Sequence, residues 1–199
     1  CGHVNPDGDC VGSVLAVTFA LREAGYEATP LLATRDCPRT LDFLAGYDEL
    51  VAASDYLASP DLFFSVDVPN IERTGDGAAV FERAKACIAI DHHQGDCAFA
   101  DVAYVDADAA AAGLIVWEFV EALGVARSAQ VAQCCYTALI TDTGRFQFQN
   151  ADARAFSAAS EMVAAGARPA FRQSASSCKA GVIRKSPPRP AESVPEAVH

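Results

Sequence analysis

Short apolar runs of strand length alternate with longer helical patterns along most of the chain. The strand-like runs are Thr29–Ala33, Asp61–Asp67 and Ala86–Asp91. Helices are predicted over Val11–Tyr26, Ala78–Lys85, Ala110–Leu123, Ser128–Leu139, and from an Asn150 cap to a stop at Gly166. Because apolar strands that alternate with helices are typical of a parallel sheet, the pattern predicts an α/β fold: a parallel β-sheet with helices on both faces.

Apolar residues at helical spacing mark two of these helices. Leu114, Trp117, Val120 and Leu123 lie on one stripe of the helix over residues 110–123. The last helix carries Phe156, Ala159 and Val163.

The overall charge is acidic, which narrows the classes of function. The 199 residues carry a formal net charge of −11, and 51% of them are hydrophobic. The strongest candidate for a membrane span, Gly113–Val125, is interrupted by Glu118 and Glu121, so no transmembrane helix is expected. The acidic balance argues against a protein that holds long nucleic acid through phosphate contacts. Short phosphorylated substrates remain compatible, because bound divalent metals can reverse the local sign of charge.

The eight cysteines form neither a C-x-x-C motif nor a zinc-ribbon spacing. Cys134 and Cys135 fall within an apolar helical pattern, where a small buried thiol is common. We therefore expect reduced, mostly buried thiols in a reducing compartment, the cytoplasm.

Composition changes abruptly near Arg172. Residues 1–171 have a net charge of −14, whereas residues 172–199 have a net charge of +3 with four prolines and five serines. We predict one globular domain over residues 1–171 and a Ser/Pro/Arg-rich tail over residues 172–199 that cannot bury a core. The tail fits either a flexible linker or a stretch read out of frame.

Acidic and imidazole side chains gather where strands or helices are predicted to end. They are His3, Asp7, Asp9, Asp67, Asp91, His92, His93 and Asp142. Gly8, between two of the aspartates, is expected to permit a tight turn that aims both into one space. Because the carboxyl ends of parallel strands line the ligand crevice of an open sheet, these side chains are expected to converge there. Carboxylates with a few imidazoles suit Mn²⁺ or Mg²⁺ better than a structural zinc.

Each of these side chains also has a simpler interpretation. Asp7 and Asp9 fit an Asx turn and a helix N-cap, and Asp67 fits a turn before Pro69. Two adjacent histidines can be a satisfied polar pair, and Asp142 can simply end a helix. Three of the four histidines lie in these clusters. All of the simpler explanations would have to hold together, so the metal site is favoured.

Four stretches that contain these side chains occur in order: residues 2–13 (GHVNPDGDCVGS), Ser65–Asp67, Ile90–His93 and Thr141–Phe146. They resemble the four motifs of the DHH phosphoesterase family. The first and last stretches, with residues 70–73, are most similar to the NrnA-type branch of oligoribonucleases and pAp phosphatases. The resemblance implies a DHH catalytic domain over residues 1–171. It also implies a metal-dependent hydrolase of short oligonucleotides or 3′-phosphoadenosine 5′-phosphate (pAp).

The resemblance further implies a two-metal centre that holds two Mn²⁺ ions, with Mg²⁺ or another divalent metal as an alternative. One ion would be held by His3, Asp7 and Asp67, and the other by Asp9, Asp67, His92 and Asp142, so that Asp67 bridges both. His93 would contact the substrate phosphate as a donor or acid, and Asp91 would support the imidazoles. Arg145 would help to hold a phosphate, unless it is simply solvated.

The sequence departs from the family pattern at both ends. It begins within the first motif, so the first strand is expected to be missing, and no glycine-rich second-domain motif appears before His199. A truncated catalytic domain is therefore expected. Two other functions stay open: a manganese-dependent inorganic pyrophosphatase, whose first motif usually has Thr where this chain has Gly8, and a metal-binding but catalytically idle module. No membrane partner is expected, and a homodimer is left open.

Overall fold

Two parallel sheets form the strand framework of the protein. The computed structural model describes residues 1–34 and 36–169, so the predicted tail over residues 172–199 lies outside the described residues. The larger sheet has the order β3 (Leu62–Val66), β4 (Ala86–Asp91), β5 (Val102–Val105). The smaller one pairs β1 (Leu31–Leu32) with β2 (Val51–Ala52). The predicted parallel arrangement is confirmed.

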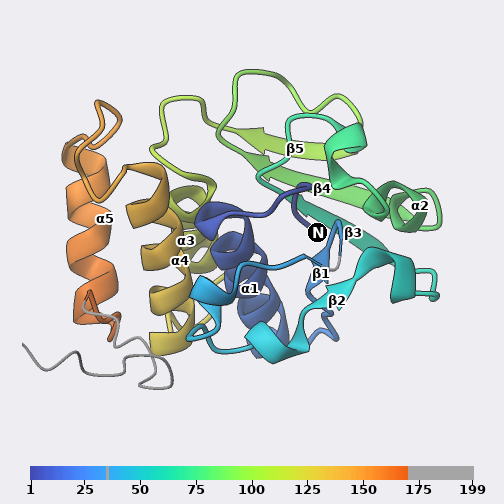
Figure 1. Cartoon of the computed structure of the whole chain (residues 1–199), viewed down its shortest axis with the longest axis horizontal. Coiled ribbons are helices and arrows are strands. Elements are labelled where there is room, and N and C mark those ends of the chain that lie inside the picture. The colour runs from blue at the N-terminus through green and yellow to red at the C-terminus, as the bar shows by residue number, and fades with distance from the viewer. Residues whose placement is uncertain (35, 170–199) are drawn as a thin grey trace, which may run out of the picture.

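Five α-helices accompany these strands within the described residues: α1 (Gly8–Glu23), α2 (Gly77–Phe81), α3 (Ala112–Ala122), α4 (Ala129–Asp142) and α5 (Ala153–Ala164). Short 3₁₀ helices lie at Arg39–Leu41, Tyr47–Glu49, Ala53–Asp55 and Ile71–Thr74. Figure 1 shows α1, α3 and α4 grouped between the large sheet and α5, with α2 at the opposite side of the molecule. His92, directly after β4, lies 3.6 Å from Asp9 of α1 and 3.4 Å from Asp142 of α4, so the carboxyl end of β4 faces these helices.

Both faces of the large sheet are covered, because alternate residues of β3 contribute to different cores. Phe64 and Val66 belong to the larger core, which they share with Ile90 of β4 and the inner sides of α1, α3, α4 and α5. Phe63 points to the other face, where it packs with Val80 of α2 and meets the Phe81 ring edge-on at 5.9 Å. The prediction of helices on both faces is confirmed.

Close packing of α1 against α4 sets the frame on which the polar cluster is built. Gly12 of α1 faces the backbone of α4, and a Cβ at this position would lie 2.5 Å from the carbonyl oxygen of Cys134. No side chain larger than hydrogen fits there without moving one of the helices. The glycine thus lets the two backbones approach, which brings the N-terminus of α1 close to the C-terminus of α4.

Several predicted helix details need correction. α1 begins at Gly8 instead of Val11, and α4 runs three residues past the predicted end, to Asp142. The cap of α5 is Asp152, whose carboxylate accepts from the N–H of Ala155 (2.8 Å), and not Asn150. Ser128 does cap α4, as predicted.

The inward face of α5 also differs from the expected one. Phe156 and Val163 are 54% and 41% exposed, and the buried residues are Ala155, Ala158, Ala159 and Met162. Small side chains let α5 pack closely on α4, so the larger apolar residues remain outside.

The sequence pattern missed β2 and β5. β2 has only two residues, too few for a periodic signal. β5 is an edge strand whose residues are mostly exposed, with Val102 at 61% and Tyr104 at 55%. An edge strand without a buried face lacks the apolar run that marked β3 and β4.

A groove lies beside the outer edge of β3. Cys1 makes two backbone hydrogen bonds to this edge, from its nitrogen to Phe64 O (2.7 Å) and from Val66 N to its carbonyl oxygen (3.1 Å). The adjoining cavity of about 490 Å³ is lined by β1, β3 and the C-terminal half of α1. The described residues include no strand that pairs with this edge of β3.

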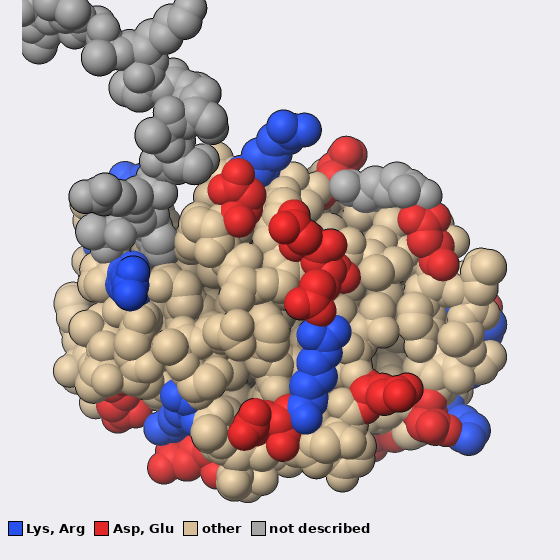
Figure 2. Space-filling model, turned by 90° about the horizontal axis from the view of Figure 1, so that it is seen from below, with Lys and Arg blue, Asp and Glu red and all other residues tan. Residues whose placement is uncertain are grey.

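The described cysteines are mostly buried, as the sequence predicts. The seven cysteines within the described residues are free, and five of them are buried. No helix in the described part of the chain is long and apolar enough to cross a membrane. On the face shown in Figure 2, the described Lys and Arg side chains are scattered among Asp and Glu and form no continuous basic patch.

Candidate metal centre

Asp67 lies at the middle of the polar cluster, directly after β3. Its backbone has φ +62°, a left-handed conformation that costs a typical L-residue about 1–2 kcal/mol. The N–H of Asp67 donates to Ile90 O (2.9 Å), which fixes this turn against β4. The turn aims the carboxylate across the strand ends toward His3 and His92. Strained backbone of this kind persists only where the surroundings impose it, and it is concentrated at functional sites.

His3 approaches Asp67 from the segment before α1. Its Nδ1 lies 2.7 Å from Val4 O and therefore carries the proton, which leaves Nε2 unprotonated in the neutral ring. Nε2 lies 3.3 Å from Asp67 Oδ2 and 3.9 Å from Asp7 Oδ1. Burial alone would lower the pKa of His3, but its contacts with Asp67 and Val4 outweigh burial and raise it.

Asp9 is fully buried in the first turn of α1 and is held by three donors. Its Oδ1 accepts from Ser13 Oγ (2.9 Å) and Gly113 N (2.9 Å), and its Oδ2 accepts from Ala112 N (2.7 Å). The two backbone donors belong to the first turn of α3, where the helix dipole favours a negative charge. Burial, with the nearby charges of Asp67 and Asp142, nevertheless raises the pKa of Asp9 well above its ordinary value.

His92 links three carboxylates from three different elements. Its Nδ1 lies 3.3 Å from Ala109 O, which directs Nε2 into the cluster. Nε2 is 3.4 Å from Asp142 Oδ2, 3.5 Å from Asp67 Oδ1 and 3.6 Å from Asp9 Oδ2. Burial alone would lower the pKa of His92, but the three carboxylates raise it to about 9. For the carboxyl group of Asp142 burial has the opposite effect, and it raises the pKa.

His93 is oriented by Asp91, the buried last residue of β4. His93 Nδ1 lies 2.8 Å from Asp91 Oδ1, and the same oxygen accepts from the N–H groups of His92 (2.8 Å) and His93 (3.3 Å). Asp91 therefore fixes the turn that carries both imidazoles. The His93 side chain is 37% exposed, so its Nε2 is the ring nitrogen left for a ligand.

One oxygen of the cluster lacks a hydrogen-bond partner within the described residues. Asp67 Oδ1 is buried, and its nearest nitrogens, His92 Nε2 and His93 Nδ1, lie 3.5 and 3.6 Å away. Burial alone would raise the pKa of Asp67, but His3 and His92 outweigh it and lower the pKa, so this carboxylate is an anion. A buried anionic oxygen without a donor is suited to a cation.

Within residues 1–34 and 36–169, three groups of side chains have ligand atoms close enough together to hold a metal ion. They are His3, Cys10 and Asp67; Asp67, His92 and His93; and Asp9, His92 and Asp142. Carboxylates combined with imidazoles are the donors that Mn²⁺ and similar divalent cations accept. The donor set and the unpartnered Asp67 oxygen thus fit a divalent-metal site.

The predicted histidines and aspartates converge on Asp67, with Asp7 at the border of the cluster. Asp7 is the N-cap of α1, as the simpler interpretation held, and its Oδ1 accepts from Cys10 N (3.0 Å) while the side chain stays 57% exposed. The buried thiol of Cys10 has its sulfur within 4.8 Å of ligand atoms of both His3 and Asp67, and burial raises its pKa. Arg145 is exposed beyond α4 and forms no ion pair with any described residue.

The role expected for Gly8 is wrong. Gly8 is the first residue of α1 and has ordinary helical backbone, so no glycine-specific turn is needed. A Cβ at this position would instead collide with the Thr141 side chain of α4. The glycine is required by the close approach of the two helix ends.

The residues that hold Asp9 and His92 in place were not predicted as part of the site. The segment Ala109–Gly113 contributes only backbone N–H and C=O groups, so no polar side chain marks it in the sequence. Ser13 occurs in the first motif, but its hydrogen bond to Asp9 follows only from the helical i, i+4 spacing. That spacing is the one signal that could have identified it.

The sequence is similar to a described protein family and to several named proteins. The family description "DHH family, N-terminal domain" matches residues 1–139. A Thermus thermophilus protein named bifunctional oligoribonuclease and PAP phosphatase NrnA is 32% identical over 167 residues, which cover 83% of this chain and 49% of that protein. Its namesake from Bacillus subtilis is 29% identical over 164 residues, covering 81% and 50%. The chain spans about half the length of these relatives.

Two solved structures share the fold. An exopolyphosphatase-related protein from Bacteroides fragilis superposes with a TM-score of 0.76 at 22% identity, over 84% of this chain and 52% of that one. A putative family II inorganic pyrophosphatase from Methanococcus jannaschii gives a TM-score of 0.63 at 21% identity, over 83% and 55%.

Proposed function

Because the chain belongs to the DHH family, we propose that the cluster around Asp67 is the metal centre of a hydrolase acting on phosphate esters. The observation that carries the proposal is the buried, unpartnered Asp67 oxygen among side chains from β3, β4, α1 and α4. The names of the Thermus and Bacillus relatives indicate the substrate class: short oligonucleotides and pAp. The free thiols of the described cysteines support a reducing compartment, and we assign the protein to the cytoplasm.

The centre is proposed to hold two Mn²⁺ ions, with Asp67 shared between them. One ion takes Asp9, Asp67, His92 and Asp142, and the other takes His3, Asp67 and Asp7. The second set is supported by the 3.3 Å approach of His3 Nε2 to Asp67. Two such ions, when bound, polarise the phosphoryl group and lower the pKa of an attacking water.

Two side chains, Asp7 and Cys10, are candidates for the third ligand of the ion that His3 and Asp67 would hold. Asp7 Oδ1 lies 3.9 Å from His3 Nε2, whereas Cys10 Sγ and ligand atoms of His3 and Asp67 all lie within 4.8 Å of one another. Burial raises the Cys10 pKa, which disfavours the thiolate that a metal would need, so Asp7 is the better ligand. Mn²⁺ titration of Asp7→Asn and Cys10→Ala separates the two: only Asp7→Asn is expected to weaken a site.

His93 and Asp91 are proposed to act on the substrate side of the centre. The Asp91 carboxylate accepts a hydrogen bond from Nδ1–H of His93 and so fixes the ring, with Nε2 free to contact a substrate phosphate. When both ring nitrogens carry a proton, Nε2 donates to the phosphoryl oxygens or passes its proton to the leaving oxygen. Arg145, exposed after α4, is proposed to add a positive charge for a further phosphate.

The proposal is tested by assaying pAp, a dinucleotide and pyrophosphate with this chain in Mn²⁺, beside Asp67→Asn. Turnover of pAp or the dinucleotide, lost in Asp67→Asn, is the expected result. Turnover of pyrophosphate alone would replace the proposal with an inorganic pyrophosphatase. Mn²⁺ binding without turnover of any of the three would identify a catalytically idle module, and the absence of Mn²⁺ binding would remove the metal centre itself.

A further inference from the structure

Asn150 connects two segments that both reach the metal-centre cluster. Its side-chain Nδ2 donates to Ala110 O (3.1 Å) and to Asp142 O (3.2 Å). Both partners are carbonyl oxygens, so the amide nitrogen, and not the amide oxygen, must face them. Asn150 is therefore free of the helix-capping role that the sequence suggested and bridges the loop before α3 to the end of α4.

The first of these segments holds two side chains of the cluster through its backbone. Ala109 O lies 3.3 Å from His92 Nδ1, and the N–H groups of Ala112 and Gly113 donate to the two oxygens of Asp9. Ala110, whose carbonyl oxygen accepts the hydrogen bond from Asn150 Nδ2, lies between these contacts in the sequence. A displacement of this segment would move His92 and Asp9 together.

The second segment ends at Asp142, the third member of the group around His92. Asp142 is the last residue of α4, where backbone carbonyls have no partner inside the helix. The carbonyls of Leu139, Ile140 and Thr141 are taken by N–H groups of the following turn. The carbonyl of Asp142 accepts from Asn150, so the backbone that carries this carboxylate is tied to Ala110.

We propose, on the basis of the function proposed above, that Asn150 is a positioning residue for the group Asp9, His92 and Asp142. One side-chain amide, with its two donors, sets the spacing between Asp142 and the segment that orients the other two. The role needs both N–H groups, so a carboxylate of the same shape cannot replace the amide.

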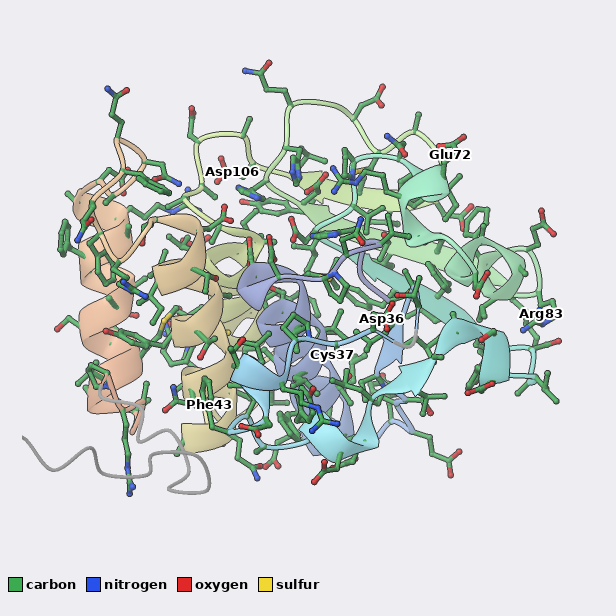
Figure 3. The ribbon with its side chains drawn as sticks, in the orientation of Figure 1. Asp36, Cys37, Phe43, Glu72, Arg83 and Asp106 are labelled. Carbon is green, nitrogen blue, oxygen red and sulfur yellow. The ribbon has the colours of Figure 1, made fainter. Side chains whose placement is uncertain are left out.

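A second contact from the same region supports this role. Arg154, in the first turn of α5, donates to Asp106 Oδ2 (2.6 Å) and pairs with Glu118 of α3. Asp106, labelled in Figure 3, follows β5 and begins the loop that leads to Ala110. The loop is thus held at one end by Arg154 and at the other by Asn150. Of these two contacts, only that of Asn150 reaches α4, through the carbonyl oxygen of Asp142.

The test is a calorimetric Mn²⁺ titration of the full chain and of the variants Asn150→Ala, Asn150→Asp and Ser128→Ala. Ser128→Ala is the control because it removes the cap at the opposite end of α4. We expect Asn150→Ala to weaken one of two Mn²⁺ sites about tenfold or more, the usual effect of losing a group that orients metal ligands. The other site should stay within about twofold, and Ser128→Ala should change neither.

Asn150→Asp separates positioning from charge. If the amide donors matter, this variant also weakens the site; if it binds Mn²⁺ more tightly than the native chain, the added charge dominates and the inference is wrong. Unchanged affinities in Asn150→Ala would likewise overturn it. Should the native chain bind no Mn²⁺, the proposed function fails, and amide exchange still decides the positioning role. Asn150→Ala, but not Ser128→Ala, must then accelerate exchange at Ala112 and Gly113, and equal rates would overturn the inference.

Discussion

The two ends of α1 lie in opposite kinds of surroundings. At the N-terminal end, Asp9 is buried and each of its carboxylate oxygens has a donor. Along the C-terminal half, Val17 and Leu21 line the cavity of about 490 Å³ beside β3. One end of the helix is fixed by specific polar contacts, and the other borders a cavity lined by both apolar and polar residues.

The contrast indicates which interactions control function and which control stability. The cluster is positioned by hydrogen bonds between α1, the start of α3 and the turns after β3 and β4, none of which involves the groove. The residues that line the groove supply none of the carboxylates or imidazoles of the cluster, so contacts along the groove should affect the free energy of unfolding more than the placement of a carboxylate. Changes at the two ends should therefore be separable by measurement.

The largest effect is expected at the polar end, from the two adjacent histidines. His92→Ala removes the imidazole that faces Asp9, Asp67 and Asp142, so Mn²⁺ affinity should fall together with turnover. His93→Ala should leave Mn²⁺ affinity nearly intact while turnover falls by roughly 10²–10⁴, the range for a lost acid or oriented donor. Titration and turnover of each variant check this, and equal loss of Mn²⁺ in both would reverse the assignment of the pair.

The next effect concerns pH and the stability of the metal-free protein. The pKa of His92 is raised from 6.5 to about 9, so the folded state binds more protons than the unfolded state between these two pH values. Stability from His92 is complete below pH 6.5 and is lost as pH rises through about 9.

The melting temperature of the metal-free protein should accordingly fall between pH 6.5 and 9.5, by on the order of 5 °C. Mn²⁺ should reverse the trend, because metal binding requires the deprotonated imidazole and strengthens as pH rises. Thermal melts with and without Mn²⁺ across this range measure both slopes. A metal-free melting temperature that rises with pH would contradict the charge arrangement at the cluster.

The smallest effect is expected at the groove. A five-residue apolar segment joined before Cys1 can extend the two hydrogen bonds that Cys1 already makes to β3. Apolar burial less the cost of ordering the segment should leave about 1 kcal/mol, or a rise in melting temperature of about 2–4 °C. Mn²⁺ affinity should not change. A Gly/Ser segment of equal length is the control, and a shift in Mn²⁺ affinity with the apolar segment would show that the two ends of α1 are coupled.

The two regions also differ in how far the sequence predicts them. The strands β3 and β4 and the cluster after them are visible because buried parallel strands are continuous apolar runs with polar residues at their ends. The sequence pattern could not show the positive φ of Asp67, which depends on pairing with β4. The segment Ala109–Gly113 escaped notice because it binds through its backbone, and Asn150 was misassigned because a cap and a bridge use the same amide side chain. Local periodicity carries no information about such tertiary contacts.

The central claim, that Asp67 is shared by two metal ions, is tested most directly by a calorimetric Mn²⁺ titration of the native chain and of Asp67→Asn. Asparagine tolerates the left-handed backbone at this position, so the substitution changes the charge with little strain. The account predicts two Mn²⁺ sites in the native chain and a loss of affinity at both in Asp67→Asn. Two unaltered sites in Asp67→Asn, or a native chain that binds a single Mn²⁺, would contradict it.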